Sequence, residues 1–352
     1  MRVCVINPNF YRSSGVTVAL RTIHAATRPL GIEQTFVSCR YGDDEEDTSW
    51  VPEGGLMSFR LMDSNPGVVA KEIWELRAWL RRTRMSIVHV HHRRLAAILC
   101  SCKTLFGFPV VYTGHLTYPF APWFWPVCPD VATAVSNSVA RNMQATTRIR
   151  DVTVIGNPVI FPGESKTSTA AETEVDAVCI GRLDSVKGHK HLIRAWANLR
   201  DQNCRAKLAL VGEGALNEEL RAQVRHAGLN DLVEFRGFRT DVRSEILRGR
   251  FCILASSVEG QPVAVIEAAA CGRASLVTDV DGSRDCLPPT RGLPNGIPFG
   301  DADAMAAALK KWLTSPEMVR QDGALFLEFL RKANSIEVVG QLYAEAYQKA
   351  AS

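Results

Sequence analysis

Short runs of apolar, often β-branched residues alternate with longer amphipathic segments throughout the chain. This alternation is typical of a parallel sheet that is covered by helices. In the first half of the chain it predicts strands over residues 2–7, 34–39, 86–91, 109–114, 131–136 and 152–157. The helices that it predicts there cover residues 16–29, 68–84, 93–105 and 137–147.

A second alternating series follows a polar stretch at residues 163–174, whose Thr, Ser and Glu content is typical of a linker. The strands predicted beyond it cover residues 176–182, 207–212, 233–238, 252–257 and 274–279. The helices predicted beyond it cover residues 188–203, 216–227, 241–249, 262–271 and 301–314. We therefore expect two α/β domains, residues 1–161 and 162–334, and a last helix at 335–352 that can pack back on the first domain.

The length and composition agree with this organisation. A chain of 352 residues can bury two cores at roughly 100–200 residues per domain. With 46% hydrophobic and 22% charged residues, it falls outside the disordered and fibrous classes. No apolar run reaches the roughly 18–20 residues that span a bilayer, and the first residues lack a charged leader. Its ten cysteines follow no disulfide or zinc spacing, so we expect a reduced, cytoplasmic protein.

The charge is small but unevenly distributed. A net charge of +4 is too low to indicate nucleic-acid binding. Residues 71–103, however, carry eight basic and two acidic side chains, which form either a solvated helix face or a patch for an anionic acceptor or membrane. Residues 117–129 contain five aromatic residues and four prolines, which fit a packed loop or one that touches an acceptor or a membrane. Peripheral contact with the inner face of a membrane therefore stays open.

Two loops have residues suited to binding an anion. The first strand is followed by Ser13, Ser14 and Gly15, a small turn that lets backbone N–H groups approach a ligand. The fingerprints of a dinucleotide site or a P-loop are absent from it. In the second half, Arg182 and Lys187 lie where a strand leads into a helix. Cations are unfavourable at a helix start unless an anion binds there, and this pair suits a diphosphate.

A third segment places two glutamates eight residues apart. Glu259 follows a buried strand, Pro262 suits the first turn of a helix, and Glu267 lies on that otherwise apolar helix. The N–H groups from Gln261 to Val265 would form a second anion site. Burial of Glu267 would require hydrogen-bonding partners such as sugar hydroxyls. The alternative is that both glutamates are solvated surface residues.

These motifs together resemble a known family. The sequences GRLDSVKG, LVGEG, RGF and a Glu-x7-Glu segment that ends in EAAACG follow one another in this order, and PVVYTGHL lies in the first half. This combination resembles the retaining glycosyltransferases of family 4. The resemblance covers nearly the whole chain and is strongest from residue 176 to residue 312. It implies the GT-B fold, in which an N-terminal acceptor domain and a C-terminal nucleotide-sugar donor domain, both Rossmann-like, face each other across a cleft.

The resemblance also implies roles for individual residues. Arg182 and Lys187 would clamp the diphosphate of the donor, which Gly15 would approach from the first domain. Glu267 would bind the ribose hydroxyls. The catalytic pair would be Glu259, at the transferred sugar, and His115, near the reacting carbon and the acceptor. The other donor-binding positions that the resemblance implies are Phe238, Arg239, Gln261, Pro262 and Val263.

The sequence departs from the family pattern in its first loop, and two further motifs match a known metal-binding pattern. Many family members have two adjacent glycines where this chain has only Gly15 after two serines. The Asp-x-Asp sequences at 279–281 and 301–303 match the metal motif of the other large glycosyltransferase fold. A Mg²⁺ ion on the diphosphate would duplicate the Arg and Lys pair, so we expect neither a metal nor another cofactor.

The histidines at 89, 91 and 92 could in principle ligate zinc. Neighbouring residues on a strand point to opposite faces, which makes a cluster of the three unlikely and leaves His91 or His92 to line the cleft.

The function that we expect is a retaining, metal-independent glycosyltransferase. It would move a sugar from a UDP- or GDP-sugar to a glycan or lipid-linked acceptor, in cell-envelope polysaccharide biosynthesis. A nucleotide-sugar epimerase of the GT-B fold is one alternative. A non-catalytic nucleotide-sugar-binding protein is another, against which His115 and Glu259 argue, because a binder needs only the phosphate clamp.

Overall fold

The first strand, β1 (Arg2–Asn7), lies at the centre of a sheet, and all its residues from Val3 onward are buried. The computed structural model describes residues 1–12, 14–39, 48–161, 173–288 and 296–352. These residues form two units, of which unit 1 comprises Met1–Pro158 and Asn334–Ser352 and unit 2 comprises Val159–Ala333. The polar stretch that we interpret as the linker lies largely outside the described residues.

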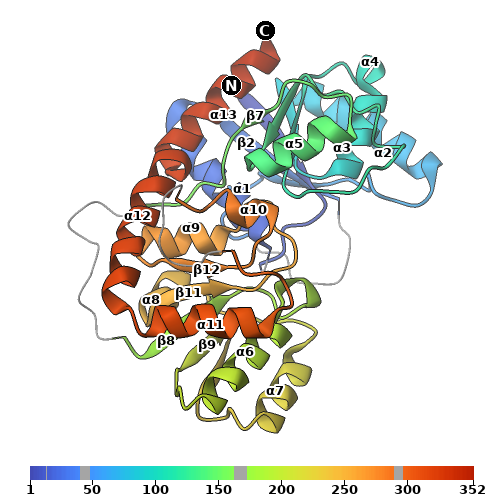
Figure 1. Cartoon of the computed structure of the whole chain (residues 1–352). Helices are drawn as coiled ribbons and strands as arrows, with labels where there is room; N and C mark the ends of the chain where they lie inside the picture. Colours follow the sequence, from blue (N-terminus) through green and yellow to red (C-terminus); the bar gives the residue numbers. More distant parts are fainter. Residues whose placement is uncertain (13, 40–47, 162–172, 289–295) are drawn as a thin grey trace. The chain divides into compact units, whose positions relative to one another are not determined.

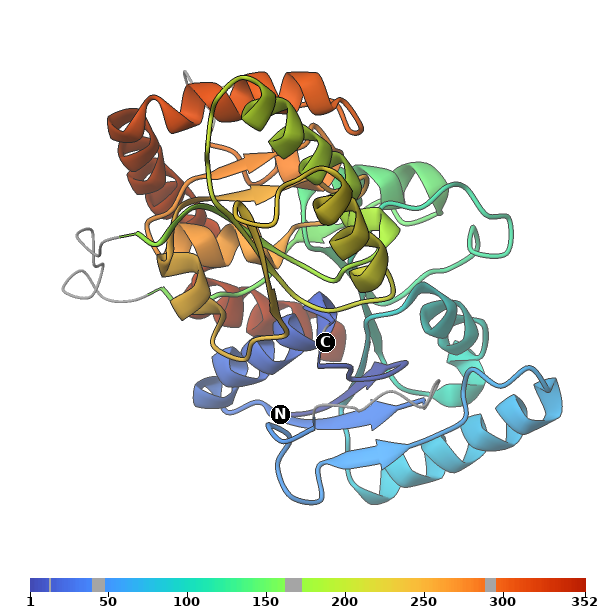
Figure 2. The same ribbon diagram turned by 90° about the horizontal axis from the view of Figure 1, so that it is seen from below.

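Unit 1 contains a parallel sheet with the strand order β3-β2-β1-β4-β5-β6-β7. Figure 1 labels the helices that accompany this sheet. The other strands are β2 (Glu33–Ser38), β3 (Leu56–Ser58), β4 (Ile87–Val90), β5 (Val110–Gly114), β6 (Val131–Ala134) and β7 (Thr153–Val154). The helices are α1 (Gly15–Thr27), α2 (Pro66–Arg82), α3 (Arg93–Ser101), α4 (Lys103–Phe106), α5 (Asn137–Thr146) and α13 (Ile336–Ala351), with a 3₁₀ turn at Arg28–Leu30. They cover both faces of the sheet (Figure 2), with α2, α3 and α5 in one core cluster and α1 and α13 in the other.

The C-terminal helix α13 is an integral part of unit 1. Its Gly340 lies so close to α1 that a Cβ atom there would stand 2.6 Å from the carbonyl oxygen of Ala26. Tyr343 and Tyr347 of α13 are fully buried in the cluster that also contains Ile87 of β4.

Unit 2 contains a second parallel sheet, with the order β10-β9-β8-β11-β12. Its strands are β8 (Val175–Ile180), β9 (Leu208–Val211), β10 (Val233–Gly237), β11 (Gly249–Leu254) and β12 (Ser275–Val277). Its helices are α6 (His189–Asp201), α7 (Asn217–His226), α8 (Val242–Leu247), α9 (Val263–Ala270), α10 (Asp281–Arg284), α11 (Ala302–Leu313) and α12 (Pro316–Asn334), with a 3₁₀ turn, η3, at Ser185–Lys187.

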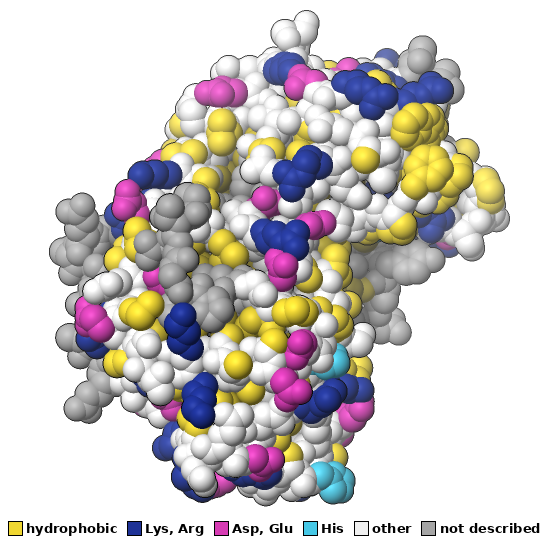
Figure 3. Space-filling model, viewed as in Figure 1, with side chains coloured by type: hydrophobic (Ala, Val, Ile, Leu, Met, Phe, Trp, Pro, Cys, Tyr) yellow, Lys and Arg dark blue, Asp and Glu magenta, His cyan; other side chains and the backbone are white. Residues whose placement is uncertain are grey.

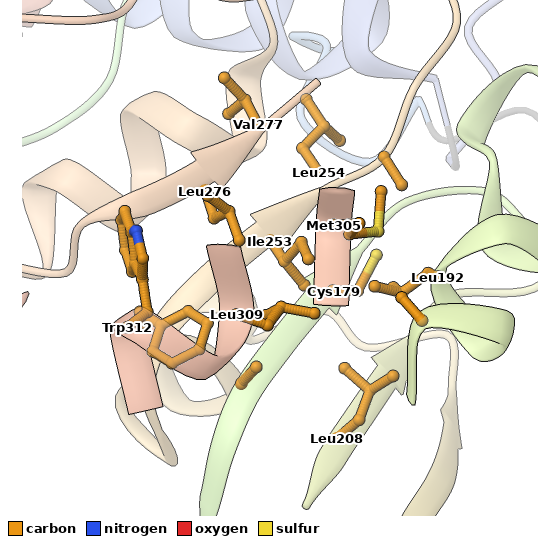
Figure 4. Packing of buried hydrophobic residues seen from close by; sticks show 14 of the residues in the cluster. Cys179, Leu192, Leu208, Ile253, Leu254, Leu276, Val277, Met305, Leu309 and Trp312 are labelled. Carbon is orange, nitrogen blue, oxygen red and sulfur yellow. The ribbon is translucent and has the colours of Figure 1, made fainter. Parts of the chain in front are cut away.

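The larger core cluster of unit 2 joins its sheet to helices α6, α7, α9, α11 and α12. Figure 4 shows side chains of β8, β9, β11 and β12 meeting those of α6 and α11 there. The labelled residues are Cys179, Leu192, Leu208, Ile253, Leu254, Leu276, Val277, Met305, Leu309 and Trp312. Ala268 of α9 and Ile246 of α8 belong to the cluster on the opposite face. Two Rossmann-like parallel sheets, as the sequence predicts, are therefore confirmed.

The structure differs from the predicted elements in several places, of which the following are the main ones. It adds the three-residue edge strand β3, which is too short to give a periodic signal, and it reduces the predicted strand at 152–157 to the two residues of β7. It also adds the 19-residue helix α12, for which the sequence pattern gave no prediction. None of the helices in the described ranges is long and apolar enough to cross a bilayer.

Candidate functional site

In unit 2, two of the predicted site residues, Lys187 and Glu259, lie at the point where the strand order reverses direction. From β8 the chain proceeds outward through β9 to β10, and then returns to the other side of β8 with β11 and β12. Open α/β sheets bind ligands at such a point, outside the carboxyl ends of the strands. Lys187 lies in the loop after β8 and Glu259 in the loop after β11, so these two loops flank the reversal point.

The two loops are joined by an ion pair. The Lys187 ammonium donates a hydrogen bond to Oε1 of Glu259 across 2.6 Å, although 72 residues separate them in the sequence. The side chain of Glu259 is 8% exposed and that of Lys187 is 22% exposed. A carboxylate so far removed from water needs such a partner, because an unpaired buried charge is costly. The pair places one positive and one negative group side by side at the reversal point.

Two glycines lie where the loops of this site pack against neighbouring backbone. Gly188 follows Lys187 with a φ of +65°, and a Cβ atom there would stand 2.0 Å from the carbonyl oxygen of Ala255, which follows β11. Gly282, in α10, packs against the backbone of Glu259 and Gly260. Side chains at either glycine would force the loops apart, so both have a packing reason to be glycine.

Arg182, the second cation of the predicted clamp, points to a neighbour in its own loop. Its guanidinium is ion-paired with Asp184 at 3.0 Å, and 55% of the side chain is exposed. Asp184 also accepts a hydrogen bond from the backbone N–H of Lys187 and thereby caps η3. The structure therefore brings Lys187, but not Arg182, into contact with Glu259.

Helix α9 presents the N-terminal end that the sequence predicts, with one correction. It begins at Val263 after Pro262, and no described side chain caps it. The N–H of Val265 donates to the carbonyl of Pro262 across 3.1 Å, so the run of N–H groups expected to be available is shorter than predicted. Gln261 and Glu267 are both half-buried.

The residues predicted to touch the base follow β10. The backbone N–H of Phe238 donates to Oε1 of Glu213 across 3.3 Å. Arg239 is exposed, and its guanidinium pairs with Glu245 at 3.3 Å. Its ion-pair partner is therefore neither residue of the Lys187–Glu259 pair. Sequence reasoning did not single out Glu213, although the LVGEG motif that contains it was part of the resemblance.

In unit 1, the predicted residues follow two strands of the central sheet. Gly15 is the exposed first residue of α1, in the connection after β1, and Ser14 is its N-cap. His115 directly follows β5. Burial lowers the pKa of His115 to about 4, so the imidazole is neutral at pH 7. Its Nε2 is 2.8 Å from Nδ1 of His91, which directly follows β4.

Two of the three histidines near β4 lie together. His89 and His91 are two residues apart and share a face of β4, and their ring centroids lie 3.9 Å from each other. His89 also contacts the hydroxyls of Tyr347, at 2.8 Å, and of Thr113, at 2.7 Å. The period of two along a strand was the signal that could have predicted this pairing.

The Asp-x-Asp sequences have other partners. Both Asp279 and Asp281 face Arg284, the first through two hydrogen bonds and the second at 3.4 Å. Asp301 caps α11 by accepting from the N–H of Ala304 at 2.9 Å. Within the described ranges, no three His, Cys, Asp or Glu side chains are grouped so that they could hold a metal ion.

Comparisons with known proteins were made for both halves of the chain. A family model described as Glycosyltransferase Family 4 matches residues 13–160, and one described as Glycosyl transferases group 1 matches residues 174–315. These matches include every predicted site residue in the two units.

Individual relatives resemble the chain either over a short segment or at low sequence identity. A Campylobacter jejuni N-acetylgalactosaminyltransferase that acts on a diphospho-undecaprenol-linked sugar is 37% identical over 100 residues, which are 28% of this chain and 27% of that enzyme. The Escherichia coli lipopolysaccharide 1,6-galactosyltransferase is 23% identical over 338 residues, 89% of either chain. The chain thus spans only about a quarter of the first of these relatives, and nearly all of the second.

Solved structures show the same fold. Anabaena HepE in complex with UDP and glucose superposes with a TM-score of 0.79 at 16% identity, covering 99% of both chains. Sucrose-phosphate synthase from Thermosynechococcus elongatus gives a TM-score of 0.79 at 17% identity over the full length of both chains.

Proposed function

Because the chain belongs to the glycosyltransferases of the GT-B fold, we propose that it is a retaining glycosyltransferase that uses a nucleotide-diphosphate sugar. Unit 2 would bind the donor and unit 1 the acceptor. The acceptor would be a glycan or a lipid-linked sugar of cell-envelope polysaccharide biosynthesis. The names of the Campylobacter and Escherichia relatives support this choice of acceptor.

The observation that carries the proposal is the ion pair between Lys187 and Glu259. It places a cation for the diphosphate beside a carboxylate for the sugar, at the strand-order reversal where such sheets bind ligands. In a nucleotide-diphosphate sugar these two groups are adjacent. A donor phosphate that approaches Lys187 would therefore bring its sugar to Glu259.

The chemistry requires stabilisation of a leaving group. As the bond between the sugar and the diphosphate breaks, negative charge grows on the phosphate oxygens. Lys187 can neutralise it, and Arg182 can join once its guanidinium turns from the exposed Asp184 pair. The N-terminal end of α9 adds oriented N–H groups near Val263. These groups make a metal ion unnecessary, so we propose that catalysis is metal-independent.

Glu259 would hold the sugar rather than attack it. A carboxylate that is ion-paired to Lys187 at 2.6 Å is a weakened nucleophile. This favours attack of the acceptor on the same face of the sugar that the diphosphate leaves, over a covalent intermediate on Glu259. Gly15, Glu267, Gln261, Pro262, Phe238 and Arg239 keep the donor-binding roles that the family resemblance implies.

The acceptor side of unit 1 has a surface suited to an anionic membrane. It comprises two aromatic-basic pairs, Trp74 with Arg77 and Trp123 with Arg93, together with the exposed Phe120. The side chains of Trp74, Phe120 and Trp123 are 67%, 59% and 51% exposed. The guanidinium of Arg93 lies 5.3 Å from the Trp123 ring centroid and that of Arg77 lies 5.5 Å from that of Trp74. Figure 3 shows exposed hydrophobic side chains beside Lys and Arg side chains over this edge of unit 1.

Aromatic rings beside cations favour the interface of an anionic bilayer. We therefore propose a cytoplasmic enzyme that works at the inner face of the membrane, where a lipid-linked acceptor would be found. Sedimentation with phosphatidylglycerol vesicles tests this: the wild type should pellet with them, and Trp123→Ser with Phe120→Ser should not. Vesicles of phosphatidylcholine are the control, and equal pelleting of both proteins would overturn the proposal.

A transfer assay tests the proposed reaction. The protein would be incubated with UDP-, GDP-, ADP- or CDP-sugars and a polyprenyl-diphosphate-linked sugar, in the presence of EDTA. We expect transfer from one donor class, UDP being our first choice, and a product whose anomeric coupling by NMR matches that of the donor. Conversion of the donor in the absence of acceptor would indicate an epimerase instead. Binding without turnover, for every donor and acceptor, would indicate a non-catalytic protein.

A further inference from the structure

The histidine beside His115 has a constrained environment. His91 is only 5% exposed, and its backbone N–H donates to the carbonyl of Ile6 in β1. Its ring packs on that of His89, which is itself fixed by hydrogen bonds to Tyr347 and Thr113. The ring of His91 therefore has little freedom to turn, and its Nδ1 is directed at His115.

The contact between the two rings is a hydrogen bond between neutral groups. Nδ1 of His91 and Nε2 of His115 are 2.8 Å apart. Burial lowers the pKa of His91 well below its usual value, and that of His115 to about 4. A neutral imidazole carries one N–H and one lone pair, so one ring donates, the other accepts, and each choice fixes both tautomers.

The other nitrogen of His91 decides between the two arrangements. Nε2 of His91 is buried and has no hydrogen-bond partner among the described residues. If His91 accepted at Nδ1, its proton would be on Nε2, and a buried N–H would lack an acceptor. If His91 donates from Nδ1, Nε2 keeps only a lone pair. Orphaned buried N–H groups are rarer in proteins than under-satisfied acceptors, so the second arrangement is favoured.

We propose that His91 is a positioning residue, which donates from Nδ1 to Nε2 of His115 and so holds the proton of His115 on Nδ1. This inference rests on the proposed function of His115. It makes His115 a hydrogen-bond donor through Nδ1, suited to a hydroxyl oxygen of the sugar or acceptor. His115 then has no lone pair left with which to remove the acceptor's proton, because its Nε2 is occupied by His91.

The tautomer can be measured without any substrate. Two-bond ¹H–¹⁵N correlation spectra of protein with ¹⁵N-labelled histidine show which ring nitrogen bears the proton, and the His115 signals are identified by their loss in His115→Gln. We expect the Nδ1–H form in the wild type. The amide of His91→Asn can replace the Nδ1 donor and should preserve this form. His91→Leu removes the donor and should shift His115 towards the Nε2–H form.

Activity provides the second readout. We expect His91→Leu to lower kcat about three- to tenfold, as the loss of one neutral hydrogen bond would, with the donor KM unchanged and with His91→Asn close to the wild type. If His91→Leu fails to fold, His91→Asp serves: its carboxylate accepts from His115 and should impose the Nε2–H form. An Nε2–H tautomer in the wild type, or the same tautomer in all variants, would overturn the proposal. The spectra are recorded without nucleotide sugar. The tautomer of His115 can therefore be established even if the protein proves not to transfer a sugar.

Discussion

Gly282 lies directly against the backbone of Glu259: a Cβ atom on Gly282 would stand 2.4 Å from the Glu259 carbonyl oxygen and 2.3 Å from that of Gly260. Gly282 belongs to α10, after β12, whereas Glu259 follows β11. The start of α10 thus supports the backbone of the loop that carries the Glu259 carboxylate, and only a glycine fits at this contact.

Substitution of Gly282 should therefore impair catalysis without touching the ligand. We expect Gly282→Ala to move the Glu259 backbone by about 1 Å and to lower kcat roughly 100-fold, because misplacements of this size cost that much at reacting groups. Steady-state kinetics measure this. Gly296→Ala is the matched control, because its Cβ would meet only Asp279, at an ordinary 3.8 Å. Equal kcat values for the two variants would contradict the idea that Gly282 positions the Glu259 backbone.

Removal of the Lys187 charge should weaken donor binding. Lys187→Met deletes a charge-assisted contact with the diphosphate, so the dissociation constant for the nucleoside diphosphate should rise roughly 10- to 100-fold. Titration calorimetry measures this constant. Lys190→Met is the control: Lys190 lies three residues away and pairs with the exposed Glu219 instead. If both variants bound the nucleotide equally well, Lys187 would not contact the phosphates.

Much of the donor site could be predicted because its residues adjoin strong strand signals. Lys187 and Glu259 follow buried apolar runs, and in a parallel sheet all such positions lie at one edge. Their mutual contact could not be predicted in the same way. It depends on β8 lying next to β11, and the hydrophobic period of a strand carries no information about its neighbours.

In unit 1, too, the contacts between residues of different strands could not be predicted from the sequence. His115 was found from its motif, but the sequence did not indicate that His91 is its partner. The pairing of β4 with β5 brings the two together, and the stacking of His89 on His91 follows from the period of two. Likewise, the sequence predicted only that the last helix can pack on the first domain, and not that Tyr347 would contact His89 of the first sheet.

The hydrogen bond between Tyr347 and His89 should contribute measurably to the free energy of unfolding. Tyr347→Phe would leave Nδ1 of His89 buried without its 2.8 Å partner, at a cost of about 1–3 kcal/mol in the free energy of unfolding. Urea denaturation of the whole chain, followed by tryptophan fluorescence, measures it. Val338→Ala on the same helix is the control, because that side chain is 38% exposed. A loss in Tyr347→Phe no larger than in the control would show that the hydrogen bond contributes nothing.

The lowered pKa of His115 also predicts how stability depends on pH. The imidazole binds a proton near its usual pKa of 6.5 in the unfolded chain, but only near pH 4 in the folded protein. Between these values the unfolded state holds the extra proton, so stability falls as the pH is lowered from 6.5 towards 4. At pH 5 the loss attributable to this group is about 2 kcal/mol, the product of about 1.5 pH units and about 1.36 kcal/mol per unit.

His115→Gln should remove that component. Urea unfolding at a series of pH values should give a variant whose stability falls less steeply than that of the wild type between pH 6.5 and 5. Above pH 7 the imidazole is neutral in both states, so the two curves should run parallel there, which serves as the internal control. Curves that stayed parallel down to pH 5 would mean that His115 is protonated as readily in the folded protein as in the unfolded chain. Its assignment as a neutral donor would then be wrong.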